Sequence, residues 1–164
     1  MAHALFADAA VAVVVTPETN GYDVVEVAAV TDATTSDHMT WDVTDLGFRM
    51  GLSERVPDVL GLHVAKMVDE LLGRHGIRRD DVAGWAVHPG GPRILDVVEH
   101  ELALPAGALD ESRSVLAEHG NCSSPTVLLV VDEVMRRSTP PEWMVALAFG
   151  PGLTLYGALL HGAR

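Results

Sequence analysis

The chain has 164 residues, of which 48% are apolar, and its formal net charge is −12. This length is typical of one globular domain, and the apolar fraction is sufficient for a buried core. The negative charge argues against nucleic acid or an anionic membrane as the main partner, because both bind basic surfaces. It leaves room for an anionic cofactor held by a few local arginines.

Several classes of site and location are excluded by what the sequence lacks. No apolar run approaches the roughly 20 residues of a membrane-spanning helix, and the N-terminus has no basic flank of a secretory signal. We therefore expect a cytoplasmic protein. The one cysteine, Cys122, excludes an intramolecular disulfide and a cysteine-based zinc site. The histidines show no spacing of a known ligand frame, so we predict no metal, and the HExxH, P-loop, GxGxxG and GxSxG motifs are absent.

The first part of the chain is predicted to be mostly extended. Residues 4–16 end in a β-branched run and residues 22–30 are rich in valine, so we predict two strands. The turn-rich residues 16–21 between them are few, which favours antiparallel pairing of the two strands. Residues 31–45 are polar and indicate a loop or an edge. Residues 46–57 indicate a short extended piece that leads to a turn.

Apolar residues at helical spacing predict a helix that has Pro57 in its first turn and ends at Gly73 or Gly76. Residues 82–87 form the next predicted strand, and Pro92 can start a second helix. The predicted buried face of the first helix consists of Leu60, Val64, Met67, Val68 and Leu71. That of the second consists of Ile94, Leu95, Val98 and Leu102.

Two further helices and two strands complete the prediction. Residues 109–120 indicate a helix capped by Asp110 and ended by Gly120. The following helix has Ser124 as its predicted cap and Pro125 in its first turn, with a buried stripe of Val127, Leu128, Val131, Val134 and Met135. The two predicted closing strands are residues 142–150 and 152–160.

This order of elements predicts a mixed α/β fold, an open sheet covered by helices. In open sheets of this kind, ligands bind where strands end and helices begin. His88 lies at such a place, directly after the strand at residues 82–87. Asn121 lies in a second junction, between two helices. The residues alone leave two interpretations of His88, a functional histidine and a buried structural one.

Four stretches of the sequence resemble one known family. They are LFADAAVAVVV (5–15), WAVHPGGPRILDVVE (85–99), SRSVLAEHGNCSSPTVLLVVDE (112–133) and FGPGLT (149–154). Together they resemble the C-terminal half of the type III polyketide synthases, the chalcone and stilbene synthase family. The resemblance implies a thiolase-like α/β fold, in which residues 1–164 form the C-terminal half of an αβαβα layered arrangement.

The resemblance also implies a chemistry. These enzymes transfer a starter acyl group from coenzyme A to a cysteine, decarboxylate malonyl-CoA and condense the resulting enolate with the acyl thioester. By the resemblance, His88 and Asn121 stabilise the thioester enolate. Coenzyme A thioesters are then substrates, and no bound cofactor is expected. The family's nucleophilic cysteine lies in an N-terminal domain that we expect to be absent from this chain. Cys122 occupies the variable position of the GNxSS motif, where a packed residue is favoured over a substitute catalyst.

The resemblance implies roles for further residues, and most of these residues also have an ordinary structural interpretation. Met50 aligns with a position that lines the pocket in the family, and ordinary core packing is the alternative. Ser123 maps near the site and is equally suited to cap a helix. Arg93 is placed to contact a coenzyme A phosphate or to be a solvated helix arginine. The family's pocket-shaping loop corresponds to Phe149, Gly150, Pro151 and Gly152.

Two functions follow. The first is the C-terminal domain of a type III polyketide synthase, an acyltransferase. It would be partnered by an N-terminal synthase domain or a full-length synthase chain, and it would be a homodimer when complete. The second is a truncated non-catalytic relative that binds acyl-CoA or a synthase. The intact His88 and Asn121 favour the first, whereas the expected lack of the cysteine half favours the second for this polypeptide alone.

Overall fold

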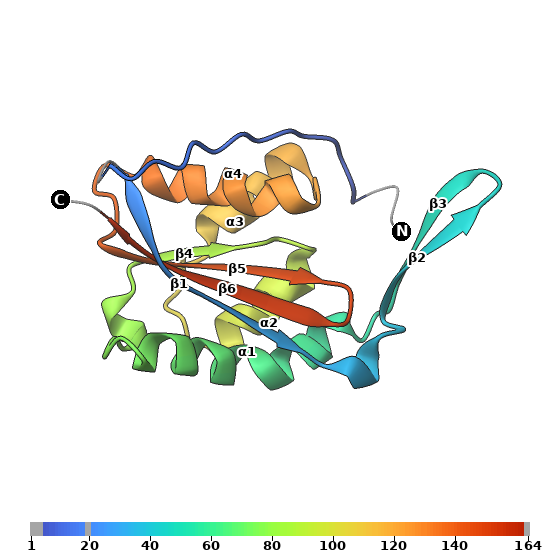
Figure 1. The fold of residues 1–164 in the computed structure, drawn as a ribbon, viewed down its shortest axis with the longest axis horizontal. Coiled ribbons are helices and arrows are strands. Elements are labelled where there is room, and N and C mark those ends of the chain that lie inside the picture. The colour runs from blue at the N-terminus through green and yellow to red at the C-terminus, as the bar shows by residue number, and fades with distance from the viewer. Residues whose placement is uncertain (1–4, 19–20, 163–164) are drawn as a thin grey trace.

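A four-stranded mixed sheet forms the centre of the chain in the computed structural model, which describes residues 5–18 and 21–162. Its strands, in spatial order, are β1 (Tyr22–Thr31), β6 (Thr154–Gly162), β5 (Trp143–Gly150) and β4 (Gly84–Val87). β4 runs parallel to β5, and the other neighbours are antiparallel. One face is covered by α1 (Val56–Gly73) and α2 (Pro92–Glu101), the other by α3 (Asp110–His119) and α4 (Ser124–Met135) (Figure 1). The predicted mixed sheet covered by helices is confirmed.

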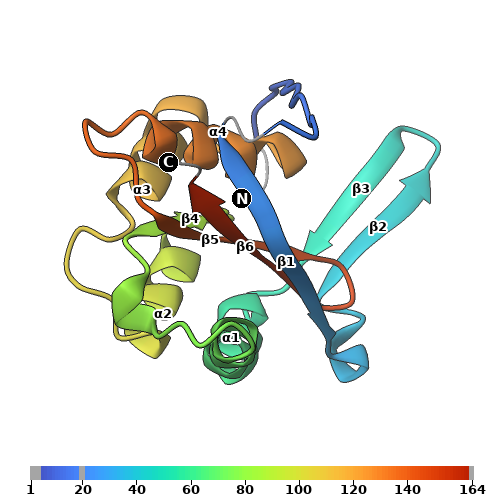
Figure 2. The same cartoon turned by 60° about the vertical axis from the view of Figure 1, so that its left-hand side comes forward.

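A hairpin stands away from this layered body. It consists of β2 (Met39–Thr44) and β3 (Gly47–Leu52), and both views show it projecting beyond the end of the sheet (Figures 1 and 2). Two short 3-10 helices, η2 (Ala33–Thr35) and η3 (Arg79–Asp81), lie in the connections. The predicted extended piece within residues 46–57 is β3. The prediction of a loop or an edge for residues 31–45 missed η2 and the pairing of β2 with β3.

The two hydrophobic clusters lie on opposite faces of the sheet. Trp85 and Val87 of β4 belong to the cluster under α1 and α2, whereas Ala86 belongs to the cluster under α3 and α4. Both faces of β4 are therefore buried, which explains why this strand reads as a continuous apolar run instead of alternating. β5 follows the same rule, with Val145 on one side and Met144 on the other.

The helices α1 and α2 match their predicted faces. In α1, Pro57 lies in the first turn, Gly73 is the last helical residue, and all five predicted core positions are buried. Pro92 begins α2, and the four predicted apolar residues are also buried: Ile94, Leu95 and Val98 within the helix and Leu102 directly after it. Leu60 and Leu95 are fully excluded from solvent, so these amphipathic stripes form the main core. Among residues 5–18 and 21–162, no helix combines the length and apolar character needed to cross a membrane.

The predicted buried strand at residues 4–16 is wrong where the structure describes it. Residues 7–16 form no strand, and Val15 is 88% exposed. The predicted pairing with residues 22–30 is also wrong, because β1 pairs with β6. The physical reason is local anchoring: backbone bonds join Leu5 and Ala7 to Asn121, which directs the segment along α4 (Figure 1). An apolar run becomes a strand only where a partner edge is available.

The helix caps and one helix face also differ from the predictions. Asp110 and Ser124 are the first helical residues of α3 and α4, and neither helix has a side-chain cap bond. In α4 the fully buried residues are Thr126, Val130 and Val134, whereas Leu128 and Met135 of the predicted stripe are exposed. α4 is apolar almost all round, so periodicity alone could not select the face that packs on the sheet.

Candidate active site

A pocket of about 890 Å³ opens where β4 and β5 end, at the hairpin end of the sheet. Its walls include the segment after β4, the end of β5 and the loop after it, the junction before α4, and the hairpin. The residues that line it include His88, Asn121, Met50, Arg93 and Phe149. The carboxyl ends of parallel strands are the place where open α/β sheets bind ligands.

His88 is held at the mouth of β4 by the sheet itself. Its backbone N–H donates to the carbonyl of Leu147 at 2.8 Å, which extends the β4–β5 pairing by one residue. The chain then turns, with Gly90 N donating to His88 O at 2.9 Å. A Cβ on Gly90 would lie 3.2 Å from Ile94 Cδ1, so a glycine allows the close packing of this turn on α2. The imidazole is thereby directed into the pocket wall.

Burial sets the protonation state of His88. Desolvation disfavours the charged imidazolium and lowers the pKa of His88 from 6.5 to about 4. Among the described residues, no side chain or carbonyl forms a hydrogen bond with either of its ring nitrogens. At neutral pH the ring is therefore an uncharged imidazole with one N–H donor and one acceptor nitrogen.

Asn121 links the junction before α4 to the turn that follows β4. Its Nδ2 donates to Gly90 O at 3.2 Å, and its Oδ1 accepts from Ser123 N at 2.9 Å. Asn121 is 4% exposed, and backbone bonds to Leu5 and Ala7 hold it from the other side. These bonds fix the orientation of the amide and tie it to Gly90, which lies two residues after His88. Among the described residues, Asn121 Nδ2 donates only this one bond, so its second hydrogen remains a donor for a ligand.

Most of the other residues predicted to line the pocket do so in the structure. Met50, Ser123, Phe149, Gly150 and Pro151 all line the pocket, whereas Gly152, also predicted to line it, is not among its lining residues. Ser123 occupies the cap position of α4 at φ 62°, a left-handed conformation held by its bond to Asn121, and its side chain makes no cap bond. This left-handed residue at a pocket wall is typical of a strained functional loop.

Arg93 is paired in this structure. Its guanidinium lies 2.6 Å from Asp58 Oδ1 and also contacts the carbonyl of Glu54 at 3.4 Å. Both side chains of the ion pair are 60% exposed, so the pair lies at the rim and not inside the pocket.

Sequence reasoning missed pocket residues that the hairpin and β6 contribute. Met39 and Trp41 line the pocket beside Met50, and Tyr156 lines it from β6. Trp41 pairs with Met50 across the hairpin and contacts Phe48 edge-on at 6.3 Å between ring centroids. The alternation of Met39, Trp41 and Val43 before a turn was the signal that could have predicted this hairpin.

Comparison with known proteins agrees with this geometry. The C-terminal domain of chalcone and stilbene synthases matches residues 26–164. The chain belongs to this family. It is 41% identical over 123 residues to a 1,3,6,8-tetrahydroxynaphthalene synthase from Streptomyces peucetius subsp. caesius, covering 74% of this chain and 33% of that protein.

Two solved structures share the fold of this chalcone and stilbene synthase domain. PKS-I from the brown alga Ectocarpus siliculosus has a TM-score of 0.80 and 31% identity, over 86% of this chain and 39% of that one. The C-terminal type III polyketide synthase domain of Steely1, a type I/III hybrid from Dictyostelium, has a TM-score of 0.83 and 28% identity, over 91% and 42%. The thiolase-like class is thus confirmed. The chain spans between a third and just over two fifths of the length of these relatives.

Cys122 of this synthase domain is packed, not presented to the pocket. It is 5% exposed, and its Sγ lies 3.3 Å from the carbonyl oxygen of His119. Residues 5–18 and 21–162 contain no group of three or more His, Cys, Asp and Glu side chains placed to hold a metal ion.

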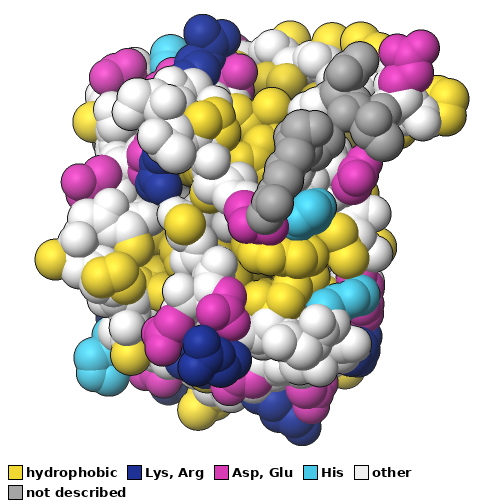
Figure 3. Space-filling model, turned by 90° about the vertical axis from the view of Figure 1, so that its left-hand side faces the viewer, with side chains coloured by type: hydrophobic (Ala, Val, Ile, Leu, Met, Phe, Trp, Pro, Cys, Tyr) yellow, Lys and Arg dark blue, Asp and Glu magenta, His cyan; other side chains and the backbone are white. Residues whose placement is uncertain are grey.

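A second hollow, of about 350 Å³, lies at the opposite end of the sheet, where Tyr22, Pro141 and Gly162 meet. Figure 3 shows this face, on which hydrophobic side chains are visible between charged groups. This hollow contains neither of the predicted catalytic side chains, which both lie in the pocket beside the hairpin.

Proposed function

We propose that this type III polyketide synthase domain supplies the hydrogen-bond donors that stabilise a thioester enolate in the decarboxylative condensation of malonyl-CoA with a CoA-linked starter. The observation that carries the proposal is the convergence of His88 and Asn121 on one pocket, linked through Gly90. These two side chains come from loops 33 positions apart in the sequence, 88 to 121.

The proposed chemistry places negative charge on one oxygen. The bond between the carboxylate carbon and Cα of the malonyl group breaks, and carbon dioxide leaves. The electron pair passes into the thioester as an enolate, whose Cα then attacks the starter thioester carbonyl and displaces its thiolate. N–H donors aimed at the enolate oxygen lower the barrier, and one such donor contributes about 10²–10³-fold in rate.

A neutral histidine suits this role. Because the pKa of His88 is lowered, the ring is already neutral at neutral pH. It can donate a hydrogen bond from its N–H without first losing a proton. The Asn121 amide adds a second neutral donor, already oriented by its bonds to Gly90 and Ser123. Two preorganised neutral donors in a partly dehydrated pocket stabilise developing charge without reorganisation.

Arg93 is the proposed contact for a coenzyme A phosphate. The chain is acidic overall, so a polyanionic ligand needs a local cation, and Arg93 lies on the pocket rim. Its exposed ion pair with Asp58 is cheap to break, because solvent-exposed pairs contribute about 0–1 kcal/mol. We expect Arg93→Ala to weaken binding of coenzyme A thioesters and leave the decarboxylation step at saturation unchanged.

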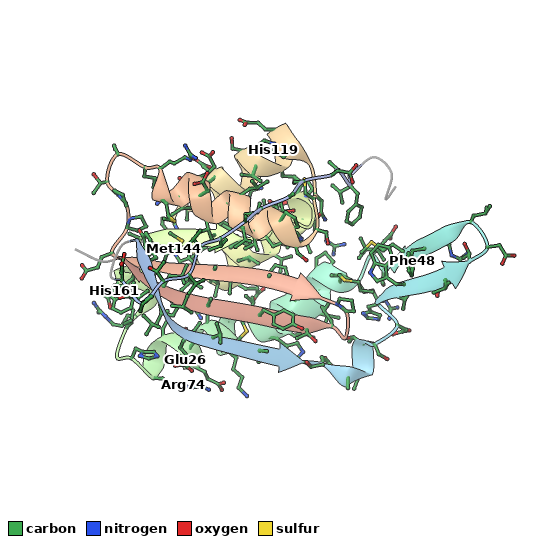
Figure 4. The ribbon with its side chains drawn as sticks, turned by 45° about the horizontal axis from the view of Figure 1, so that its top comes forward. Glu26, Phe48, Arg74, His119, Met144 and His161 are labelled. Atoms are coloured by element: carbon green, nitrogen blue, oxygen red, sulfur yellow. The ribbon has the colours of Figure 1, made fainter. Side chains whose placement is uncertain are left out.

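The proposed partner is an N-terminal synthase domain that carries the nucleophilic cysteine. Several apolar side chains are exposed within the described chain: Val14 and Val15 in the segment along α4, and Leu46 and Phe48 on the hairpin. Phe48 is 75% exposed and lies on the projecting hairpin, away from the sheet (Figure 4). An exposed apolar set of this kind is typical of a surface that another domain covers. A homodimer of the complete enzyme stays a prediction.

The test is carbon dioxide release from malonyl-CoA by this chain, alone and mixed with a separately produced N-terminal domain of the Streptomyces relative. We expect release from the mixture, reduced about 10²–10³-fold by His88→Ala and by Asn121→Ala. The matched control is His119→Ala, because His119 is an exposed histidine at the end of α3, outside the pocket (Figure 4).

Circular dichroism on each variant separates loss of activity from loss of folding. Release that persists in folded His88→Ala would refute the assigned role of the ring. Binding of acetyl-CoA without any release from the folded mixture would refute the enzymatic proposal and leave a non-catalytic binding protein.

A further inference from the structure

Asp32, the residue that follows β1, gathers hydrogen bonds from two elements. Its Oδ1 accepts from Thr34 N at 3.0 Å and from Thr34 Oγ1 at 2.5 Å, within η2. Its Oδ2 lies 2.9 Å from Nε2 of His63, on α1. The side chains of Asp32 and His63 are 19% and 31% exposed, so the pair is partly sheltered from water. Hydrogen bonds from Thr34 first, and then from His63, lower the pKa of Asp32, which keeps the acceptor charged.

The turn at residues 32–35 holds Leu153 from both sides of its peptide. Asp32 N donates to Leu153 O at 2.9 Å. Leu153 N donates to Thr35 Oγ1 at 2.9 Å, and the same hydroxyl donates to Asp32 O at 2.8 Å. Thr35 is buried, so these bonds are shielded from competing water. Leu153 directly follows the loop of Phe149 to Gly152, whose first three residues form a wall of the pocket.

The same turn also holds the base of the hairpin. His38 N donates to Thr35 O at 2.9 Å, and Ser53 N donates to His38 O at 2.8 Å. These bonds close the two ends of the hairpin directly before Met39 and after Leu52, which both line the pocket. One four-residue turn therefore supports two pocket walls that are far apart in the sequence.

We infer that His63 is a positioning residue for the pocket: through Asp32 it fixes the turn at residues 32–35, and the turn fixes the loop before Leu153 and the base of the hairpin. His63 itself does not line the pocket. α1 is the longest helix in the described chain and is packed in the main core, so it is a rigid support for this turn. The inference rests on the proposed function only in taking the pocket as the substrate site.

The test is a nuclear magnetic resonance comparison of folded variants, with ¹³C-methyl methionine and ¹⁵N amide labels. In His63→Ala we expect the Met39 and Met50 methyls and the Leu153 amide to shift. Met144 is the internal control, because it is fully buried in the other cluster, under α3 and α4. His63→Gln retains a side-chain N–H donor and should restore most of the wild-type positions.

The matched control is His75→Ala. His75 also pairs with a carboxylate, at 2.5 Å from Glu26 Oε2, but this pair lies on the outer side of β1, near Arg74 (Figure 4). We expect it to leave the Met39, Met50 and Leu153 signals unchanged. A second pair of variants keeps the test decisive if His63→Ala does not fold.

In that second pair, Thr35→Val removes the bonds of the hydroxyl at nearly constant volume, whereas Thr35→Ser retains them. Thr35→Val should shift the same three signals and weaken acetyl-CoA binding, and Thr35→Ser should not. Unchanged Met39, Met50 and Leu153 signals in folded His63→Ala, or in folded Thr35→Val, would overturn the inference. Wild-type protein that fails to bind acetyl-CoA would instead count against the proposed function, because the spectra do not depend on the ligand.

Discussion

Acidification to pH 5 should destabilise this domain through His88. Burial lowers the pKa of His88 in the folded chain from 6.5 to about 4, whereas the unfolded chain has the ordinary value. Between these two values the unfolded state binds a proton that the folded state does not, so the free energy of unfolding falls as pH falls. The two pKa values give a loss of about 2 kcal/mol between pH 7 and pH 5, and a limit of about 3 kcal/mol below pH 4.

The assay is urea unfolding of wild type and His88→Gln at pH 7, 6 and 5, followed by circular dichroism. Subtracting the two free energies at each pH removes the titration of all other groups, which both proteins share. We expect the wild type to lose about 2 kcal/mol more than His88→Gln between pH 7 and pH 5. A difference that stays constant over this range, or a His88 ring that titrates near 6.5 by nuclear magnetic resonance, would refute the reasoning.

Three further predictions concern packing and the lone thiol. Thr126→Val should lower the free energy of unfolding by about 1–3 kcal/mol, because the buried hydroxyl accepts from Cys122 N and donates to Ser123 O, and urea unfolding measures the loss. Gly84→Ala should cost about 1–3 kcal/mol by the same method, because its Cβ would lie 2.6 Å from Pro141 Cγ. Cys122, 5% exposed, should react with Ellman's reagent orders of magnitude more slowly in the native chain than in urea.

Each of these three has a control. Thr126→Ser retains both bonds and should remain near the wild-type stability, so an equal loss in the serine variant would contradict the hydrogen-bond argument. Gly73→Ala adds a Cβ that meets no atom within 4 Å, and it should leave stability unchanged or slightly raised. Rapid native reaction of Cys122, at the rate of the unfolded chain, would contradict its burial.

Local sequence patterns determined most of the secondary structure. The stripe of Leu60, Val64 and Met67 specified both α1 and its buried face, because a 3.6-residue period places these side chains on one side. Pro92 and Gly120 marked a helix start and a helix end by their own backbone preferences. These features depend on neighbours within a few positions, so no tertiary information was needed.

Patterns that depend on a distant partner failed. Residues 4–16 have strand composition, but the described part finds no strand edge and lies along α4. The apolar surface of α4 allowed several faces, and packing on β4 and β5 selected the one with Val130. The pairing of Trp41 with Met50 also depends on a partner strand, because it is set by the register of the whole β2–β3 hairpin.

For the site, the sequence by itself predicted which side chains would carry the proposed chemistry. His88 and Asn121 were evident from their positions at junctions and from the motifs around them. Only the tertiary structure decided that they share one pocket, that burial keeps His88 neutral, and that Arg93 pairs with Asp58. Desolvation and long-range contact arise from atoms distant in sequence, and His63 is the clearest case: its link to the pocket wall exists only through the folded turn at residues 32–35.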